Sequence, residues 1–502
     1  MNRDESFALF AKGRDAWNDW AEKRFDEREK LAVIGSWVDS LSESDWNDET
    51  RAWHAATATD FSSSQFLHLT NFSDFVFPGS AVFDQVQFIG PTIFDRAMFT
   101  GNARFQRAVF MGDTEFHKVT FTGGARFGGA NFNGNTEFGG ATFAGVALFD
   151  RAKFTGDARF GGVPFTGPAL FDRATFTGEA LFARATFTRN ARFSGATFMG
   201  RTLFSGATFR EDAEFLQAVF EGYTAFNGAK FESSVDFGAI EAKRLFSLAG
   251  TTFVAVPDFI QAHFAEAPRL DDSHIESRRF RPITQARIKD SLKGDPNLAA
   301  CWRALKRLAI QGHDHAREQT FFKGELKARR WSEDMPWHAV FWFGLVYQVL
   351  SDFGRSILRP FLWWGASVVG FAGLYLGQHP TLAKESWSTV RWLFQSLTDP
   401  SGEMPPLTCV AGPGEPWVAA LHLSVQKGLL LPGLVPINKL NQIYACLYGI
   451  LPTDAAQPGQ LPTSFSPVIP DGVMALGFLQ QPLSAVLIFL LLLAIRNHFR
   501  IK

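Results

Sequence analysis

Phenylalanine recurs along the first half of this chain at a fixed spacing. From Phe61 to Phe264 the phenylalanines follow one another at alternating steps of five and six residues. Of the 38 positions in this series, 36 are Phe, and the two exceptions are Ala242 and Leu248. An aromatic side chain at so regular an interval must occupy the same structural place in every repeat. The series therefore determines the architecture of this segment, although it does not by itself indicate a function.

The full period of the series is 11 residues, and Gly recurs in phase with it at Gly156, Gly167, Gly178 and Gly200. A period of 11 can also produce a right-handed helical supercoil. Each Gly inside a helix costs about 1 kcal/mol, so a helical reading does not fit this composition. Glycine suits tight turns with positive φ, and we expect these glycines to lie in such turns.

A small residue stands two positions before many of the phenylalanines, as Ala97 does before Phe99 and Ala103 before Phe105. In a strand, residues i and i−2 face the same side. We therefore expect Ala and Phe to point inward and the residue between them to point outward. Further inward alanines are Ala158 and Ala185, and the expected outward residues include Arg104, Arg159, Leu181 and Thr186.

These repeats resemble those of pentapeptide-repeat proteins, in the subtype that has Phe at its centre and Ala two residues before it. The resemblance implies a right-handed quadrilateral β-helix with four short faces per coil. Steps of 5+6+5+6 residues give 22 residues per coil, so residues 58–264 would make roughly nine coils. We expect the extra residue of each six-residue step to lie at a corner as a bulge-like insertion.

The stacked rings are interpreted as the interior of this solenoid, and no Phe is assigned to a ligand pocket. Stacked coils contact their neighbours and need capping at both ends. The residues chosen to represent the core are Phe99, Phe105, Phe110, Phe116, Phe154, Phe160, Phe187 and Phe193.

Polar helical segments flank the repeats. Residues 1–57 are expected to form an N-terminal helical cap, because the cluster from Gly13 to Trp20 resembles the segment that often precedes such repeats. Residues 265–335 are expected to be a charged linker and helix. Within them, His313 and His315 are two residues apart and so point to different sides of a helix, which argues against a metal site.

Residues 336–502 are expected to form an α-helical membrane domain. Segment 361–377 is apolar over 17 residues and segment 473–495 over 23, which correspond to about 26 and 35 Å of helix. An aromatic segment at 337–352 is too short to cross and suits a helix lying on the membrane surface. Loop 378–472 joins the two spans.

Charge predicts the orientation of these spans. Residues 278–360 hold 16 Lys and Arg against 8 Asp and Glu, whereas loop 378–472 holds only four Lys and Arg. Lys and Arg stay on the cytoplasmic side, so both termini and the solenoid should be cytoplasmic. The segments 331–360 and 491–502 resemble the corresponding parts of membrane-bound bacterial pentapeptide-repeat proteins. The resemblance implies a multi-pass protein of the bacterial inner membrane.

No catalytic arrangement is found in the sequence. It has no Gly-rich phosphate loop, no Cys pair with zinc spacing and no nucleophile elbow, so we expect no enzyme activity, cofactor or metal. Glu115 and Glu137 are interpreted as part of a solvated face that also carries Arg104, Arg126 and Arg159. Residues 58–264 hold 19 acidic and 17 basic side chains, a balance that argues against DNA mimicry and against nucleic-acid binding.

An apolar segment at 416–436 lies between the two spans and leaves two interpretations open. It is either a re-entrant, pore-like segment or an amphipathic helix on the outer leaflet. An intramembrane charge indicates function by default, but Lys427 would repel cations. The candidate re-entrant residues are Ser424, Lys427, Gly428 and Pro432.

Two cysteines of the outward loop, Cys409 and Cys446, are a candidate disulfide because an oxidising exterior would permit a bridge. Unpaired thiols are the alternative.

Two functions are compatible with these features. The first is a membrane-anchored, non-enzymatic scaffold or sensor that binds an unknown cytoplasmic protein. Leu148 and Leu170 are 22 residues apart, as are Leu181 and Leu203, so each pair would stack on one face as an apolar contact. The alternative is a homo-oligomeric, two-span protein similar to an ion channel, in which the β-helix regulates the re-entrant segment.

Overall fold

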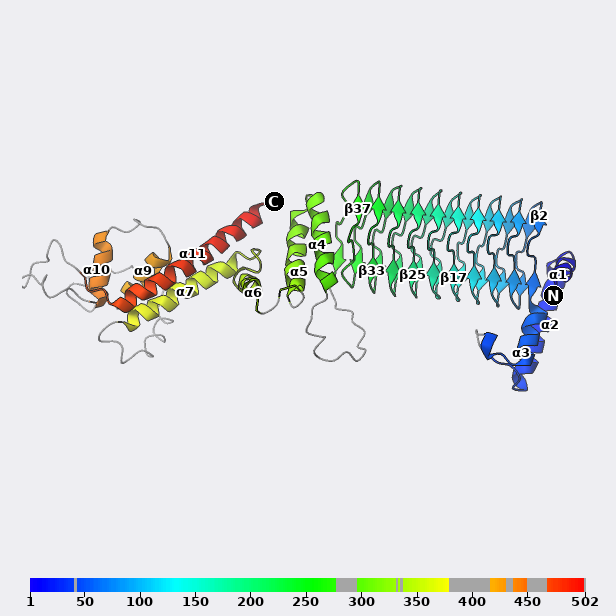
Figure 1. Ribbon diagram of the computed structural model, residues 1–502, viewed down its shortest axis with the longest axis horizontal. Coiled ribbons are helices and arrows are strands. Elements are labelled where there is room, and N and C mark those ends of the chain that lie inside the picture. The colour runs from blue at the N-terminus through cyan, green and yellow to red at the C-terminus, as the bar shows by residue number, and fades with distance from the viewer. Residues whose placement is uncertain are drawn as a thin grey trace, which may run out of the picture. The chain divides into compact units, whose positions relative to one another are not determined.

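A computed structural model describes residues 1–39, 43–276, 296–330, 333–334, 337–378, 416–429, 437–448 and 467–500. These residues form two compact units, Met1–Glu333 and Asp334–Lys502, each with its own hydrophobic core (Figure 1). The first unit contains the Phe series and the second contains the long apolar segments.

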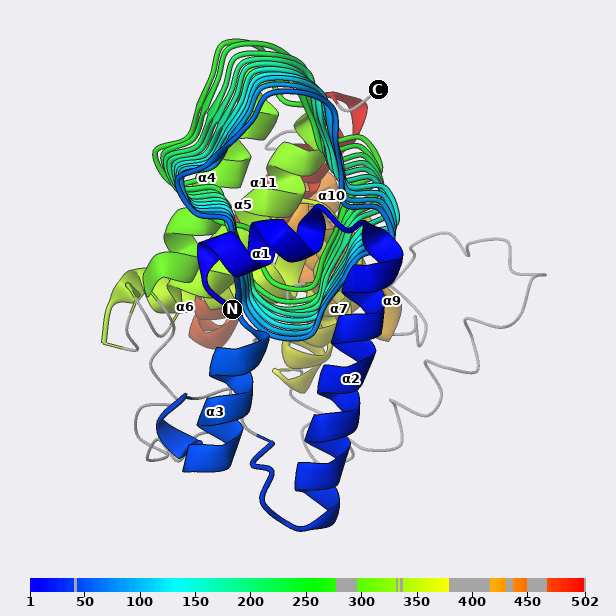
Figure 2. The ribbon, with the colours of Figure 1, turned by 90° about the vertical axis from the view of Figure 1, so that its right-hand side faces the viewer.

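The first unit is a β-solenoid with four parallel sheets (Figures 1 and 2). Every strand is two residues long, and its partners lie 22 residues away, as Ala147 pairs with Ala169. The predicted four faces and 22-residue coil are therefore confirmed. Face A runs from β1 (Thr59–Asp60) to β33 (Val235–Asp236), face B from β2 (Gln65–Phe66) to β37 (His263–Phe264), face C from β3 (Thr70–Asn71) to β35 (Phe246–Ser247), and face D from β4 (Val76–Phe77) to β38 (His274–Ile275).

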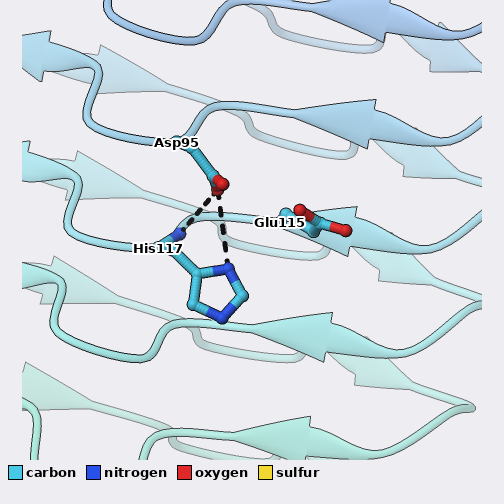
Figure 3. Close-up of side chains that lie close together, drawn as sticks. All are labelled: Asp95, Glu115 and His117. Atoms are coloured by element: carbon cyan, nitrogen blue, oxygen red, sulfur yellow. Dashed lines mark hydrogen bonds and ion pairs between the residues drawn. The ribbon is translucent and has the colours of Figure 1, made fainter.

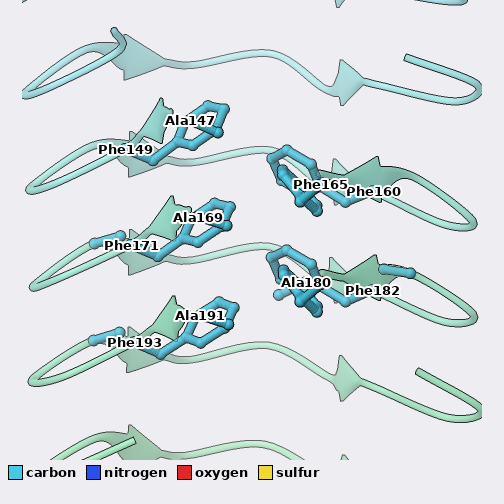
Figure 4. Close-up of a cluster of buried hydrophobic side chains, with 14 of the residues drawn as sticks. Ala147, Phe149, Phe160, Phe165, Ala169, Phe171, Ala180, Phe182, Ala191 and Phe193 are labelled. Atoms are coloured by element: carbon cyan, nitrogen blue, oxygen red, sulfur yellow. The ribbon is translucent and has the colours of Figure 1, made fainter. Parts of the chain in front are cut away.

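The Phe rings fill the interior in parallel stacks (Figure 4). Phe149 and Phe171 stack with ring centroids 4.8 Å apart and planes 1° from parallel, and Phe193 continues the stack. Across the interior, Phe149 meets Phe160 edge to face at 5.6 Å, which is a favoured aromatic geometry. Each residue chosen from the sequence to represent the core is at most 1% exposed: Phe99, Phe105, Phe110, Phe116, Phe154, Phe160, Phe187 and Phe193.

The prediction of positive φ at the in-phase glycines is wrong. Gly156, Gly167, Gly178 and Gly200 have no positive φ, and that conformation occurs at the other type of corner, where Arg173 is one of its occupants. The reason for these glycines is the packing of coil on coil. A Cβ on Gly178 would lie 2.5 Å from the carbonyl oxygen of Gly156 in the preceding coil, so only Gly permits the stacking distance.

The expected bulge in the six-residue steps is also wrong. The corner between β2 and β3 comprises residues 67–69, whereas the corner between β3 and β4 comprises residues 72–75. The six-residue step therefore contains the shorter corner. The alternation of five and six arises because Phe is the last strand residue on faces B and D and follows the strand on faces A and C.

One of the two exceptions in the Phe series, Ala242, is compensated by a ring from outside the series. Ala242 interrupts the face B stack between Phe220 and Phe264. Phe246, which occupies an inward position of face C that is otherwise Thr or Ala, contacts the rings of Phe220 and Phe264 at 5.5 and 5.4 Å. Leu248 is fully buried at the other exception, so the interior stays apolar there too.

Two helices cover the first coil of the solenoid. Helix α1 (Arg3–Phe10) crosses the open end, as Figure 2 shows, and Phe10 lies 4.7 Å from the ring of Phe72. Helix α2 (Arg14–Val33) buries Trp17, whose Nε1 donates to the carbonyl of Val76 at 2.9 Å. The remaining elements of this end are the 3-10 helix η1 (Glu43–Asp45) and α3 (Asp48–Thr57).

The solenoid runs to Ile275, eleven residues beyond the predicted boundary at 264, and is then covered by a helical hairpin. Helices α4 (Pro296–Gln311) and α5 (His315–Arg329) belong to the same hydrophobic core as the Phe stacks, to which they contribute Trp302 and Phe321. Residues 296–329, predicted to be linker and helix, therefore cap the solenoid.

The second unit contains two helices that are long and apolar enough to cross a membrane, α7 (Leu358–Gly377) and α11 (Asp471–Arg500). They include the predicted spans 361–377 and 473–495. Most residues of their apolar stretches are not buried within the protein. Shorter helices accompany them: α6 (Ala339–Ser351), α9 (Pro416–Gly428) and α10 (Ile437–Tyr448).

A tight turn joins α6 to α7. Asp352, Phe353 and Gly354 have consecutive positive φ values, and a Cβ on Gly354 would lie 2.7 Å from the hydroxyl of Tyr347. The Nδ2 of Asn497 donates to the carbonyl of Gly354 at 3.3 Å. The segment around residue 354 and the C-terminal segment, both singled out in the sequence, are thus in direct contact.

Candidate functional site

A buried polar network joins α7, α9 and α11. The hydroxyl of Ser424 donates to the carbonyl of Val368 at 2.6 Å, and the Nε2 of Gln480 donates to both the carbonyl and the hydroxyl of Ser424 at 2.8 Å. The hydroxyl of Tyr375 donates to the Oε1 of Gln480 at 2.9 Å. Tyr448 of α10 completes the network by donating to the carbonyl of Tyr375 at 3.0 Å. Each helix thus supplies a group that would be costly to leave unpaired.

These bonds place α9 along α7 in the antiparallel direction. Ser424 lies beside Val368, and the carbonyl of Gly428 accepts from the Nε1 of Trp364 at 3.1 Å. Val368 is about 15 Å along α7 from Leu358, and Trp364 only about 9 Å. Measured from the C-terminal end of α7 at Gly377, helix α9 therefore extends past the middle of α7 to the level of Trp364.

Gly428 allows this close approach. A Cβ there would lie 3.2 Å from Val368 Cγ2, 3.4 Å from Ser484 Oγ and 3.5 Å from Gln480 Nε2. The neighbouring helix faces would have to yield to accept it. Small residues at helix contacts are the usual device for bringing apolar helices together.

Lys427 lies beside this contact with a partly buried side chain. Its Cε lies 3.9 Å from where a Cβ on Gly477 would be. The lysine side chain therefore points toward the second turn of α11. Within the residues that the structure describes, Lys427 forms no ion pair. Among the described residues, the hydroxyl of Ser484 and the Oε1 of Gln426 are buried without a hydrogen-bond partner.

The other predicted residues of this region fall partly outside the described residues. Pro432 and Cys409 lie outside them, and Cys446 belongs to α10 without a described side chain, so the candidate disulfide stays a prediction. Cys301 of α4 is a buried cysteine that takes part in no disulfide among the described residues.

Ion pairs connect successive coils on the solenoid surface. Arg96 bonds Asp74 through Nε at 2.6 Å, and Arg201 bonds Glu179 at 2.9 Å, each pair 22 residues apart. The hydrogen bond from Arg96 holds the pKa of Asp74 below its usual value. Such exposed pairs contribute little to stability, so the surface they form is free to vary with function.

The leucine pairs lie on two different faces. Leu148 of β17 (Ala147–Leu148) is in register with Leu170 of β21 (Ala169–Leu170) on face A. Leu181 of β23 (Ala180–Leu181) is in register with Leu203 of β27 (Thr202–Leu203) on face C. All four side chains are half-buried. The predicted stacking within each pair is therefore present, on opposite sides of the coil.

Three side chains with metal-ligating atoms lie close together near the start of the solenoid (Figure 3). Asp95, Glu115 and His117 bring one ligand atom each within 4.8 Å of one another, and all are half-buried. His117 donates its backbone N–H to Asp95 at 3.1 Å, and its Nδ1 lies 3.5 Å from the same carboxylate. The sequence interpretation treated Glu115 as solvated and missed this grouping, which the 22-residue spacing from Asp95 to His117 could have indicated.

A family model for pentapeptide repeats, of nine copies, matches residues 72–120, 105–151, 116–164, 160–205 and 193–240. The solenoid is a pentapeptide-repeat domain. No curated protein and no solved structure matches the chain. The family match lies wholly within the solenoid, so the functional reading of the second unit rests on its own geometry.

The pentapeptide-repeat domain and the second unit differ in what the sequence could indicate. The sequence picked out Ser424 and Gly428 for their place in an apolar segment. Their partners were not identified, because Val368 and Gln480, which bond Ser424, and Trp364, which bonds Gly428, all lie at least 56 residues away along the chain. A glutamine inside an otherwise apolar segment was the available signal, since a buried amide needs partners.

Proposed function

We propose that the protein is a non-enzymatic scaffold or sensor of the bacterial inner membrane, whose pentapeptide-repeat domain binds a cytoplasmic protein. The observation that carries the proposal is the joining, on one chain, of a filled solenoid and two helices long and apolar enough to cross a bilayer. A solenoid whose interior is closed by Phe offers only its outward side chains for recognition.

Membrane placement is supported by exposure and charge. The apolar stretches of α7 and α11 are mostly unburied, which is unfavourable in water and favourable in lipid. The 16 Lys and Arg between residues 278 and 360, against four between 378 and 472, support a cytoplasmic solenoid. Helix α6 exposes Trp342 and Phe343 at 55% and 73%, which suits a helix lying at the membrane surface.

The leucine pairs support protein binding by faces A and C. On face A, Leu148 and Leu170 are framed along the column by Arg126 and Arg192. An apolar centre with a charged rim is the usual composition of a protein interface.

Photocrosslinking in native membranes tests the scaffold function. A photoreactive residue at Leu170 or Leu181 should capture one defined protein. The matched control is Thr197 of β26 (Thr197–Phe198), which points outward on face B one coil further along the solenoid. Equal capture from Thr197, or capture from none of these positions, would remove the support for faces A and C.

The second candidate function is an oligomeric protein similar to an ion channel, in which α9 is a re-entrant helix. The specific observation in its favour is the position of α9 against the middle of α7, through Ser424 and Val368. A helix on the outer leaflet would contact only the end of a span. The buried network supports the re-entrant interpretation over the surface helix.

Bilayer recordings on the purified protein separate the two functions. A channel should carry current that Lys427→Glu alters in ion selectivity, because this cationic side chain lies beside α9's inner end. Absence of current at every protein concentration would leave the scaffold alone. Cysteine labelling from residue 420 to 434 adds a topological check, since uniform reactivity from outside contradicts a re-entrant segment.

A further inference from the structure

An apolar groove runs along the outside of α7 in the second unit. It has a volume of about 620 Å³. Its lining comes from three helices and includes Leu350, Trp363, Gly370, Leu374, Leu483 and Leu487. The hydroxyl of Ser367 is among the few polar groups there, so the groove suits a hydrocarbon and not a polar ligand.

The groove exists because α7 lacks side chains where it passes α11. A Cβ on Gly370 would meet nothing within 4 Å, and Ala366 contributes only a methyl group. From Trp363 to Leu374 the lining extends about 16 Å along α7. A long, narrow, apolar space of this length matches an extended acyl chain better than a compact ligand.

Basic residues stand in the chain segments next to one end of the groove. Arg359 lies beside the carbonyl of Gln348, with Nη1 at 3.5 Å, two residues from the groove residue Leu350. Arg355 is the residue after Gly354 in the turn between α6 and α7. The carbonyl of Gly354 accepts a hydrogen bond from Asn497 of α11, so this turn lies against α11.

Arg496 is adjacent to that asparagine in the sequence, and Arg355, Arg359 and Arg496 are all exposed. Asp352 is the acidic residue of this turn. Within the described part of the chain none of the three arginines forms an ion pair, so this end of the groove carries a net positive charge. Guanidinium groups bind phosphate in a bidentate manner, which gives this end its complementarity to a phosphate ester.

We propose that this groove binds one anionic phospholipid, with an acyl chain along α7 and the headgroup phosphate on Arg355 and Arg359. The inference rests on the proposed placement of α7 and α11 in a bilayer. A zwitterionic lipid would occupy the apolar part equally well, and the arginines select the anionic one. The bound lipid would fix the turn between α6 and α7, which joins the membrane helices to the segment leading from the solenoid.

Native mass spectrometry of the full chain, released from nanodiscs that contain equal amounts of phosphatidylglycerol and phosphatidylcholine, tests the proposal. We expect one retained phosphatidylglycerol per chain, favoured roughly tenfold over phosphatidylcholine because two basic residues act near the headgroup. The double variant Arg355→Gln/Arg359→Gln should lose the preference and keep the lipid. Gly370→Leu should lose both lipids, whereas Gly365→Leu, on the same helix with open space at its Cβ and outside the groove, should behave as the wild type.

Equal retention of the two lipids by the wild type, or a preference that survives loss of both arginines, overturns the proposal. So does a lipid-free dimer that Gly370→Leu dissociates, because a second copy would then occupy the groove. Carbonate extraction of cell membranes is measured in parallel. Release of the wild type by carbonate contradicts the membrane placement itself, whereas an integral protein without lipid preference contradicts only the lipid site.

Discussion

The internal contacts that stabilise the first unit of this protein differ in kind from those that stabilise the second. The pentapeptide-repeat domain repeats one contact many times: each Phe stacks on the Phe of the next coil, as Phe149 does on Phe171. The second unit depends on single contacts that occur once, such as the bonds of Gln480 to Ser424. Stability in the first is distributed over many equivalent positions, and in the second it is concentrated in a few.

The largest effect should come from removing one ring in the middle of the stacks. Phe171→Ala leaves a cavity between Phe149 and Phe193, and we expect a loss of about 3–5 kcal/mol in the free energy of unfolding. Circular dichroism of the detergent-solubilised chain during denaturant titration measures it. The outward neighbour Leu170→Ala is the control and should cost much less. Similar losses for the two variants would contradict the assignment of Phe171 to a closed core.

A methyl group at a coil-on-coil contact should be nearly as damaging. Gly145→Ala would place a Cβ 2.4 Å from the carbonyl oxygen of Gly123, and we expect overpacking to cost about 1–3 kcal/mol or more. The control is Gly161→Ala, whose nearest neighbour is an ordinary contact at 3.7 Å. If both substitutions are neutral in the same titration, the in-phase glycines are not required for stacking.

In the second unit, loss of one amide should weaken the packing of three helices. Gln480→Ala leaves the hydroxyl of Tyr375 without its acceptor and removes both bonds from Nε2 to Ser424, and we expect a cost of about 1–2 kcal/mol. The adjacent Gln481→Ala is the matched control, because Gln481 is exposed. Fluorescence of Trp364, next to the end of α9, reports the loosening. Equal free energies of unfolding for the two variants would show that the network does not stabilise the second unit.

The smallest effect should be a pH dependence at the C-terminal cap of the solenoid. Burial tends to raise the pKa of Glu325, but hydrogen bonds from Lys306 and Arg303, at 2.5 and 3.0 Å, outweigh it and lower the pKa. Because the pKa of Glu325 is lower in the folded state, its ionised carboxylate stabilises that state at pH values above the usual carboxyl pKa. This contribution to stability is lost as the pH falls through the lowered pKa.

Hydrogen exchange measures this dependence at the cap. Protection of α4 and α5 should decrease as the pH falls below about 4.5, and Glu325→Gln should show weaker protection at neutral pH with less acid dependence. Protection that is unchanged between neutral and acidic pH in the wild type would show that the ion pairs do not hold the cap.

The same contrast explains how much the sequence could predict. Periodicity reveals whatever is repeated, so the 11-residue period and the buried Phe positions followed from the spacing, whereas the four faces and the 22-residue coil were implied by the resemblance to pentapeptide-repeat proteins. The sequence indicated Gly178 as a required glycine, but it assigned the requirement to positive φ and not to the contact between coils. Spacing shows that a glycine recurs, and it does not show which of these two causes requires it. Phe246 was not identified from the sequence, because it lies outside the regular Phe series although its ring fills the space beside Ala242.

In the second unit the helices followed from apolar length, and their contacts did not. The bonds of Asn497 to Gly354 and of Gln480 to Tyr375 join residues more than 100 positions apart and occur once each. No period marks such pairs. The contact of α9 with the middle of α7, on which the proposed re-entrant interpretation rests, is visible only in the three-dimensional arrangement.

The proposed placement of the solenoid inside the cell is tested most directly by labelling intact cells with a membrane-impermeant maleimide, after mild reduction and removal of the reductant. Cys409 reports on the segment between α7 and α11, and Thr197→Cys reports on the solenoid. We predict that Cys409 reacts in intact cells and that Thr197→Cys reacts only after the membrane is permeabilised. Labelling of Thr197→Cys in intact cells would contradict a cytoplasmic, membrane-anchored solenoid.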